Sequence, residues 1–416
     1  MKPALKWLAI LPVLFALLLL NPSCGREKAL ADFFDQEFDA YIKRVLYDWN
    51  APGVVISVVK DGQHIFAKGY GSRQAGEDLP VDEHTLCTIA SNTKAMTATA
   101  LAMLVDEGKL KWDDPVKRYI PELKCPDDYV TENMTIRDLL AHRAGLPFRL
   151  GEWNDPDYTM ERLLGDLPLR EPATGFRERH AYSNVGYALA GEVVARLSGM
   201  SWEEFVTSRI FEPLGMSSTY ASPTRLEEAL GEPAQIENLF LPAYEREGEV
   251  VATDWRGFGY VYAPAAGVIT TAEDIAKWMI FQLNEGVIEG QRLVSEVSVQ
   301  EMLTPQISVD RVWWEHHSVL ANFLVYDLGW VSYDHRGRRV NEHPGGGMWA
   351  VVALVPEEDL GVAIFTNLWW TDFKSVRMVN AIKLRIIDAF LGAPEHDWCA
   401  DYLQRHKQWL ARRAGS

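Results

Sequence analysis

The chain has 416 residues, of which 48% are apolar, and a formal net charge of -17 at pH 7. This length and composition are sufficient for one large hydrophobic core or for two subdomains. The acidic excess argues against a nucleic-acid partner, because no basic stripe is present to meet a phosphate backbone.

The first 31 residues have the pattern of an export signal. A basic segment, Met1 to Lys6, precedes the apolar run Trp7 to Leu20, which is too short to span a bilayer comfortably. Two kinds of processing fit equally well: signal-peptidase cleavage after Ala31, or lipid attachment at Cys24. We therefore expect an exported protein, periplasmic or extracellular, with a lipid on Cys24 as one route to membrane attachment.

Three more cysteines follow, Cys87, Cys125 and Cys399. Because three is odd, at least one thiol stays unpaired within a monomer, which leaves open a Cys87 to Cys125 bridge or three buried free thiols. Their spacing does not match a metal site, and no cofactor is expected.

The first elements predicted are a helix and a β-hairpin, and then a helix that starts near Ser91 and stops at the capping Gly108. The ranges are Asp32 to Tyr47 for the first helix, and Gly53 to Lys60 and Gln63 to Gly71 for the hairpin around Asp61-Gly62. A mainly helical stretch follows from about 110 to 250. Its clearest helices are 136–142, 185–197 and 202–210, the last with a capping box, Ser201 to Glu204.

A further helix is expected over Ala272 to Leu283, capped by Thr270 and stopped by Gly286. Three apolar segments then predict adjacent antiparallel strands, and an amphipathic helix closes the fold. They are 328–333, 351–355 and 360–367 for the strands and 376–390 for the helix. Residues 395–416 are expected to form an exposed helical tail, polar enough to be a linker.

Strands near both ends of the chain with helices between them predict an α/β (α+β) fold: an antiparallel sheet flanked by helices, with a helical insertion over about 80–250. The domain is expected to span 32–394. A cleft should open between the sheet and the insertion.

The main chemical signal is Ser91-x-x-Lys94 on a predicted helix. Residues three apart share a helix face, so the amine can activate the weakly nucleophilic hydroxyl. The same spacing at Ser57 and Lys60 falls in a predicted strand, where the two side chains point to opposite faces. Ser57 is therefore interpreted as a structural serine.

Two other segments complete the requirements of acyl transfer. Tyr182-x-Asn184, which occurs once in the chain, offers a proton shuttle just before a helix. His343, Gly345 and Gly346 lie in a glycine-rich segment expected to lead into the strand from Val351, where backbone N–H groups can approach a substrate.

In this order, the three motifs resemble those of the class C β-lactamase-like serine hydrolases, part of the serine β-lactamase and penicillin-binding-protein superfamily. Similar segments extend the resemblance to residues from about 35 to 392; they are 135–147, 211–216 and 271–276. The resemblance implies a β-lactamase/transpeptidase-like fold.

The resemblance also implies roles for the residues. Ser91 would be the acylated nucleophile, Lys94 and Tyr182 would share the base role, and Tyr182 would protonate the leaving group. A Lys94 ammonium would favour a Tyr182 phenolate, whereas desolvation would favour a neutral amine. Asn184 would orient both Lys94 and the acyl side chain of the substrate, and backbone N–H groups of Ser91 and Gly346 would form the oxyanion hole.

Some positions depart from typical β-lactamases. His343 stands where those enzymes have lysine, which removes a permanent cation and fits the esterase and peptidase branches. Substrates with a carboxylate are then expected to bind better as His343 becomes protonated. Pro344 removes a backbone donor from its strand. Three tryptophans near the motif are expected mainly to pack in the core, with shaping of an acyl pocket as the alternative; they are Trp349, Trp369 and Trp370. His142 is expected to be structural.

We therefore expect a serine hydrolase that acts through an acyl-serine on small-molecule esters, or on D-amino-acid amides or peptides. Two alternatives remain open. One is an envelope penicillin-binding protein with D-Ala-D-Ala carboxypeptidase or weak β-lactamase activity. The other is a non-catalytic protein that binds peptidoglycan or penicillin.

Overall fold

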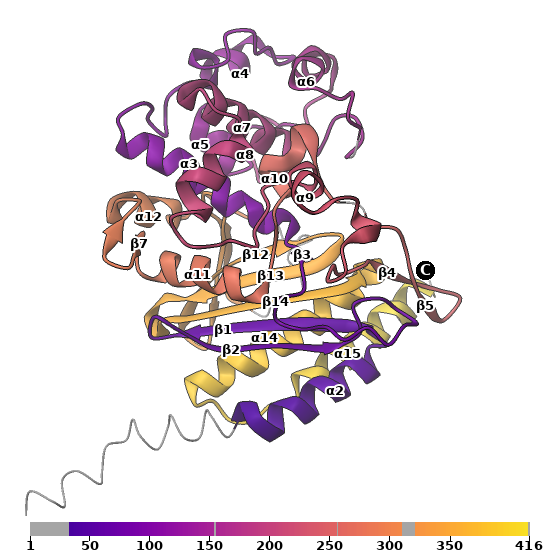
Figure 1. Ribbon diagram of the computed structural model, residues 1–416. Coiled ribbons are helices and arrows are strands. Elements are labelled where there is room, and N and C mark those ends of the chain that lie inside the picture. The colour runs from indigo at the N-terminus through magenta and orange to yellow at the C-terminus, as the bar shows by residue number, and fades with distance from the viewer. Residues whose placement is uncertain (1–32, 154, 256, 310–320, 415–416) are drawn as a thin grey trace, which may run out of the picture.

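A computed structural model describes residues 33–153, 155–255, 257–309 and 321–414 (Figure 1). The predicted export signal, with Cys24 and Ala31, lies outside these residues. Among the described helices, none is both long and apolar enough to cross a bilayer.

The fold is built on a central ten-stranded sheet whose main path runs β2-β1-β14-β13-β12-β11-β10-β9, with β4 pairing to β14 and β5 to β4. Two small two-stranded sheets, β3-β6 and β7-β8, lie apart from it. The strands are β1 (Gly53–Lys60), β2 (Gln63–Gly71), β3 (Cys87–Thr88), β4 (Ala243–Arg246), β5 (Glu249–Ala252), β6 (Ile269–Thr270), β7 (Val287–Ile288), β8 (Gln291–Arg292), β9 (Ile307–Ser308), β10 (Leu324–Tyr326), β11 (Val331–His335), β12 (Arg338–Gly345), β13 (Met348–Val355) and β14 (Leu360–Trp369).

Helices cover both faces of this sheet, and a helical region stands above it in Figure 1. The helices are α2 (Phe38–Asp48), α3 (Thr93–Asp106), α4 (Asp128–Asn133), α5 (Ile136–Leu140), α6 (Met160–Asp166), α7 (Asn184–Ser198), α8 (Trp202–Val206), α9 (Pro223–Leu230), α10 (Ala263–Ala266), α11 (Ala272–Leu283), α12 (Glu296–Met302), α14 (Lys374–Leu391) and α15 (Trp398–Ala414). The expected fold class, an antiparallel sheet with an inserted helical region, is confirmed.

Strand β1 shows why the sheet is covered on both sides. Its β-branched residues alternate between two cores: Val54, Ile56 and Val58 pack toward α2 and α14, whereas Val55 and Val59 face α3 and α11. β1 lies between β2 and the late strand β14, with Val54 opposite Thr366 and Lys60 opposite Leu360. The two ends of the chain therefore share one sheet, as predicted.

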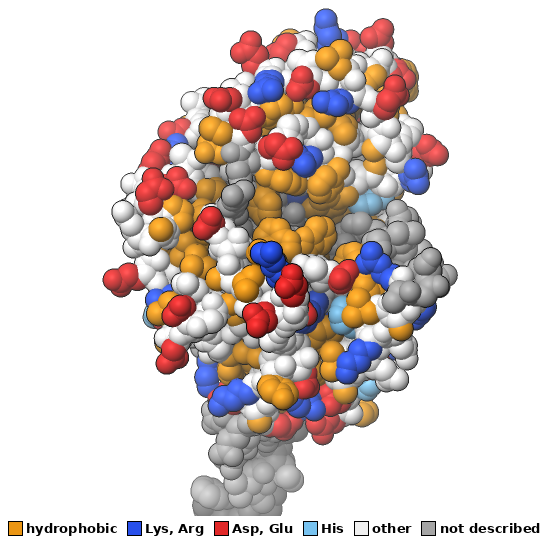
Figure 2. Space-filling view, turned by 90° about the vertical axis from the view of Figure 1, so that its right-hand side faces the viewer, with side chains coloured by type: hydrophobic (Ala, Val, Ile, Leu, Met, Phe, Trp, Pro, Cys, Tyr) orange, Lys and Arg blue, Asp and Glu red, His pale blue; other side chains and the backbone are white. Residues whose placement is uncertain are grey.

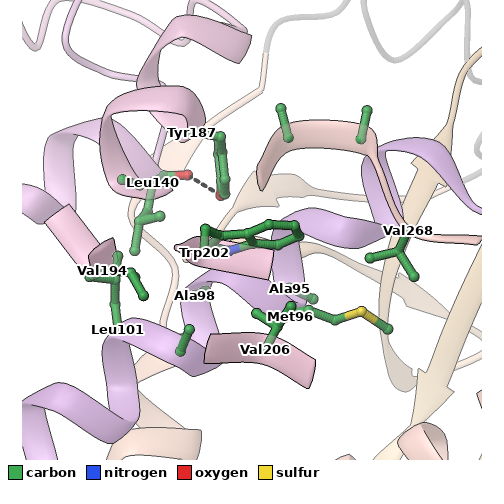
Figure 3. Close-up of a cluster of buried hydrophobic side chains, with 14 of the residues drawn as sticks. Ala95, Met96, Ala98, Leu101, Leu140, Tyr187, Val194, Trp202, Val206 and Val268 are labelled. Carbon is green, nitrogen blue, oxygen red and sulfur yellow. Dashed lines mark hydrogen bonds between the residues drawn. The ribbon is translucent and has the colours of Figure 1, made fainter. Parts of the chain in front are cut away.

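Helix α3 is buried on nearly all sides, which suits its run of alanine, threonine and leucine. It packs among α7, α8, α10 and the segment at Val268, and Figure 3 shows the cluster of apolar side chains that surrounds it. Within that cluster the Tyr187 hydroxyl donates to the Leu140 carbonyl at 2.8 Å. The core thus fixes the helix that carries Lys94.

Most predicted elements agree with the structure, and the differences have physical causes. The hairpin of β1 and β2 matches its predicted range, and the capping box of α8 is present. Helix α11 is capped by Thr271, not Thr270, because the Thr271 hydroxyl accepts from the Asp274 N–H.

The late strands are arranged differently from the prediction. β13 and β14 are neighbours, but β12 separates β11 from β13. His343 to Gly345 belong to β12 itself, instead of leading into the strand from Val351, and β13 starts at Met348. The apolar pattern of the sequence did not predict this strand, because β12 consists mostly of polar residues and contains one proline and one glycine.

The C-terminal segment is helical as expected, but it is not an exposed tail. Trp398, Cys399, Tyr402 and His406 on one face of α15 are buried, and the helix packs on α14. Cys87, Cys125 and Cys399 are all buried free thiols, so the alternative of a Cys87 to Cys125 bridge is wrong.

Candidate active site

Ser91 lies in a short 3₁₀ helix, Ala90–Asn92, that leads directly into α3. Ala90 before it has a φ of 44°, a left-handed conformation that is strained for alanine. The Asn92 amide holds this turn against the sheet: it donates to the Ile89 carbonyl at 2.7 Å and accepts from the Val352 N–H at 3.0 Å. The turn presents the Ser91 hydroxyl at the surface of a pocket.

Lys94 reaches Ser91 from inside the core. Its Nζ lies 3.1 Å from Ser91 Oγ, 2.8 Å from Asn184 Oδ1 and 2.9 Å from the Ala265 carbonyl, and the side chain is fully buried. This burial holds the pKa of Lys94 well below its usual range. In its neutral form the amine has two N–H groups and one lone pair; because Asn184 and Ala265 offer only acceptor oxygens, that form would turn its lone pair toward the Ser91 hydroxyl.

Tyr182 joins the same cluster. Desolvation raises the pKa of its phenol, and the hydrogen bond with Ser91 lowers it by less. Its ring centroid lies 4.9 Å from Lys94 Nζ. The phenol is therefore neutral, and the expected phenolate beside an ammonium does not fit this resting arrangement. A neutral phenol can donate to the Ser91 oxygen while the Ser91 hydroxyl donates to Lys94.

A loop at residues 142–148 places Tyr182 and Asn184. The Ser183 N–H donates to His142 Nδ1 at 3.0 Å, and the Ser183 hydroxyl donates to the Pro147 carbonyl at 2.7 Å. The Asn184 N–H donates to the Phe148 carbonyl at 2.8 Å. His142 is buried and has a φ of 55°. Its structural interpretation agrees with these contacts.

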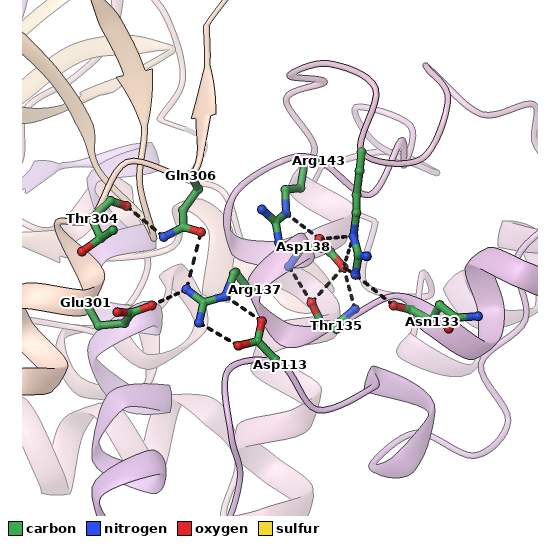
Figure 4. Close-up of polar contacts among 10 residues, drawn as sticks. Asp113, Asn133, Thr135, Arg137, Asp138, Arg143, Glu301, Thr304 and Gln306 are labelled. Carbon is green, nitrogen blue, oxygen red and sulfur yellow. Dashed lines mark hydrogen bonds and ion pairs between the residues drawn. The ribbon is translucent and has the colours of Figure 1, made fainter.

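This loop is anchored in turn by the buried carboxylate of Asp138 (Figure 4). Asp138 completes a capping box with Thr135 and accepts from Arg143 Nε at 2.5 Å and from Arg177 Nη2 at 2.7 Å. Burial opposes ionisation, but the hydrogen bonds from Arg177 and Thr135 outweigh it and lower the pKa of Asp138. Asp138 therefore ties the loop to the segment that precedes Tyr182.

His343 lines the pocket but is engaged with the protein. Its Nε2 lies 2.8 Å from the Tyr326 hydroxyl, and its Nδ1 lies 2.8 Å from the Pro344 carbonyl. Since a carbonyl only accepts, Nδ1 carries the proton and Tyr326 donates to Nε2. This arrangement argues against the expectation that protonated His343 meets a substrate carboxylate.

The two glycines have different surroundings. A Cβ on Gly345 would lie 2.5 Å from the Ile89 carbonyl oxygen, so a side chain there would push β12 away from the Ser91 turn. Gly346 is half-buried with no atom within 4 Å of its Cβ position, and it lines the same pocket as Ser91. The predicted oxyanion-hole residues thus border one cavity.

That cavity has a volume of about 1040 Å³ and lies between the sheet and the helical region, where a cleft was expected. On the face shown in Figure 2, hydrophobic side chains gather in a recess between the upper and lower parts of the molecule. Trp349, Trp369 and Trp370 all line the pocket. Trp349 is buried in the core and Trp369 packs against it, as expected, whereas Trp370 is 42% exposed, so the expectation of core packing is wrong for Trp370.

Sequence reasoning missed several residues of the site. Asn92 lies inside the Ser91 motif, but its link to β13 depends on a tertiary contact with Val352. The carbonyl of Ala265 and the ring of Phe258 carry no motif of their own. Among the described residues, no group of three or more His, Cys, Asp or Glu side chains is placed to hold a metal ion.

Comparison with known proteins agrees with this geometry. The chain is 28% identical over 394 residues to an unguisins hydrolase, ungD', of Aspergillus campestris, covering 91% of this chain and 70% of that protein. It is 29% identical over 259 residues to the protein flp of Staphylococcus aureus, covering 60% and 49% of the two chains.

Two solved structures share the fold. The octameric penicillin-binding protein homologue from Pyrococcus abyssi has a TM-score of 0.70 at 26% identity, with 86% of this chain and 77% of that chain covered. The class C β-lactamase from Rhodobacter sphaeroides has a TM-score of 0.66 at 21% identity, with 84% and 99% covered.

The family model described as Beta-lactamase matches residues 38–382. This match covers the sheet, the helical region and all three motifs. The chain therefore belongs to the Beta-lactamase family of serine hydrolases, as its motif order predicted.

Proposed function

We propose that this protein hydrolyses small-molecule esters, or D-amino-acid amides or peptides, through an acyl-Ser91 intermediate. The observation that carries the proposal is the buried Lys94, whose Nζ lies 3.1 Å from Ser91 Oγ and donates to Asn184 Oδ1 and the Ala265 carbonyl. A serine needs such a neighbour to act as a nucleophile at neutral pH.

In the proposed acylation step, Lys94 takes the Ser91 proton as the Ser91 oxygen attacks the carbonyl carbon. The negative charge moves to the carbonyl oxygen, where backbone N–H groups of Ser91 and Gly346 stabilise it. The tetrahedral intermediate then breaks its bond to the leaving group, which takes the phenol proton of Tyr182. The Lys94 ammonium returns a proton to Tyr182, and both groups are neutral again.

In the proposed deacylation step, water attacks the acyl carbonyl and gives its proton to the same pair. The bond to Ser91 breaks, the serine oxygen regains a proton, and the acid leaves. Efficient β-lactam hydrolysis is not part of the proposal, because the ring nitrogens of His343 are engaged by Tyr326 and Pro344. A permanent cation for the substrate carboxylate is missing at that position.

Steady-state hydrolysis of p-nitrophenyl butyrate, D-alanine p-nitroanilide and the β-lactam nitrocefin tests this proposal. We expect many turnovers of the ester or the amide, none by Ser91→Ala, and at most slow turnover of nitrocefin. If nitrocefin is the only substrate, the β-lactamase alternative holds. If a β-lactam acylates Ser91 without release and no ester or amide is turned over, the protein is a penicillin binder.

We also propose that the protein is exported, on the basis of the basic and apolar pattern of residues 1–31. Expression in a bacterial host followed by fractionation and mass measurement tests this point. Lipidation predicts a mature N-terminus at Cys24 that carries a lipid and is lost in Cys24→Ala. Simple secretion predicts cleavage after Ala31, and an intact Met1 terminus in the cytoplasm would refute both.

A further inference from the structure

One wall of the pocket is formed by aromatic side chains at the end of the sheet. Trp349 is the second residue of β13, Trp369 is the last residue of β14, and Trp370 follows it. The rings of Trp349 and Trp370 are nearly parallel, with centroids 6.3 Å apart and planes at 18°. Trp370 is 42% exposed although it is a large apolar side chain. An exposed tryptophan that lines a cavity is available to a ligand.

Three further aromatic side chains line the same pocket, Phe148, Trp153 and Phe258. Trp153 contacts Phe258 with ring centroids 5.2 Å apart, and Phe148 contacts Trp153 at 5.8 Å. Gly347 has a φ of 103°, and a Cβ there would lie 3.1 Å from the Phe258 ring. Because the same Cβ would also lie 3.7 Å from Trp369, the glycine leaves the space beside both rings free of a side chain in this aromatic pocket.

The rim at Trp370 is held in place by α15. Asp372 and Phe373 have φ values of 51° and 58°, left-handed conformations that aspartate tolerates but that are strained for phenylalanine. Arg413 pairs with Asp372 at 2.9 Å, and the ring of Phe373 contacts that of Trp409 at a centroid distance of 5.7 Å. These contacts fix the wall before any ligand arrives, which lowers the entropy cost of binding.

The charged side chains that line the pocket disfavour an anionic substrate. Among the described residues that line it, the charged side chains are Glu152 and Asp155, and lysine and arginine are absent. Each acid is paired with an arginine outside this lining, Arg149 at 3.3 Å from Glu152 and Arg162 at 3.7 Å from Asp155. A carboxylate entering the pocket would therefore lose its hydration and meet no cation that is not already paired with an acid.

We propose that the substrate is an ester or amide that carries a large, uncharged apolar or aromatic group next to the scissile bond, and that Trp370 sets this specificity. The inference rests on the proposed acyl-Ser91 function. It makes Trp370 a residue that contacts substrate and takes no part in proton transfer.

Three pairs of synthetic esters test the proposal. The acyl group varies between p-nitrophenyl butyrate and p-nitrophenyl 4-phenylbutyrate, and the leaving group varies between ethyl and benzyl butyrate, followed by acid release. Charge varies between p-nitrophenyl hexanoate and the p-nitrophenyl half-ester of adipic acid. Ser91→Ala gives the background rate for each.

We expect at least tenfold higher kcat/KM for the phenyl-bearing member of the acyl or the leaving-group pair, and at least tenfold lower kcat/KM for the adipate half-ester. Trp370→Ala should reduce the phenyl preference about tenfold through KM. Tyr47→Ala is the matched control, since Tyr47 is 86% exposed and lies outside the pocket.

A second variant tests the charge argument independently of Trp370. Glu152→Lys reverses a charge on a side chain that is 77% exposed, so the fold should tolerate it, and it should raise kcat/KM for the adipate half-ester several-fold. Equal use of all members of the three pairs, with hydrolysis still dependent on Ser91, would overturn the inference while the proposed function stands. Loss of all Ser91-dependent hydrolysis would overturn both.

Discussion

Lys94 Nζ lies 3.1 Å from Ser91 Oγ, yet Lys94 is fully buried while Ser91 borders an open pocket. The base therefore approaches the nucleophile from the protein side and leaves the solvent side free for a substrate. The buried position also lowers the pKa of Lys94 and so favours the neutral amine, because an ammonium there would lose its hydration.

Replacing this base should abolish catalysis without unfolding the protein. Lys94→Met keeps the length and apolar stem of the side chain but removes the lone pair, so kcat should fall by about 10²–10⁴. Ester hydrolysis, with circular dichroism to verify folding, measures the effect. Activity within threefold of the wild type would show that Lys94 is not the base.

The Lys94→Met variant also tests the lowered pKa of Lys94, because a lowered pKa makes the free energy of unfolding depend on pH. Between its folded pKa and the unfolded value of about 10.4, the unfolded state binds one more proton, so the wild type gains stability as pH rises. The free energy of unfolding of the wild type minus that of Lys94→Met should therefore increase from pH 7 to pH 10, measured by urea denaturation. A difference that stays constant or falls would mean that Lys94 is charged in the folded protein.

Tyr182→Phe should affect poor leaving groups more than good ones. The raised pKa makes Tyr182 a neutral acid that protonates the departing oxygen or nitrogen, and p-nitrophenolate needs little such help. We expect kcat/KM to fall about 10³-fold for an ethyl ester but about tenfold for the p-nitrophenyl ester of the same acid. Equal losses on both esters would assign Tyr182 to another role.

Gly345→Ala should lower both stability and activity, because it disturbs the packing of β12 against the Ser91 turn. Its new Cβ would lie 2.5 Å from the Ile89 carbonyl, which forces β12 away from the Ser91 turn. We expect a loss of about 1–3 kcal/mol in unfolding free energy and a large loss in kcat. Gly346→Ala is the control for stability, since its Cβ would meet no atom within 4 Å. Equal stability of the two variants would contradict the model of close packing.

Asp388→Asn tests how α15 is attached. Asp388 accepts from Trp398 Nε1 at 2.9 Å and pairs with His335 Nε2 at 2.7 Å. Burial opposes ionisation, but these contacts and Arg336 lower the pKa of Asp388 to about 2. The variant should lose about 2 kcal/mol at pH 7.

That loss has a defined pH range. The folded pKa of Asp388 is depressed, so its contribution is complete above the unfolded value of about 4 and disappears as pH falls toward 2. Urea denaturation of both proteins at pH 7 and near pH 3 measures it. A difference that grows on acidification would mean that Asp388 is neutral in the folded protein.

Local chemistry made much of the fold predictable. The β-branched run of β1 with its Asp-Gly turn gave the first hairpin with its correct ends. The spacing of Ser91 and Lys94 predicted their contact, because a helix brings residues three apart together. In contrast, Ser57 donates to the Ala272 carbonyl in a strand and stays structural.

The features of the fold and of the site that could not be predicted from the sequence depend on tertiary contacts. β12 contains Glu342 and Pro344, which disfavour a buried strand, but Lys383 pairs with Glu342 from α14 beneath the sheet. The buried face of α15 did leave a signal, since Trp398, Tyr402 and His406 recur every four residues. The neutral state of Tyr182 follows from desolvation, which sequence does not report.

The most direct test of the account is the site of covalent modification by a fluorophosphonate, measured by intact mass and peptide mapping. The account predicts one adduct on Ser91 in the wild type, none in Ser91→Ala, and an unchanged adduct in Ser57→Ala, the other serine with a lysine three residues later. An adduct on a different residue, or an equal adduct in Ser91→Ala, would contradict it.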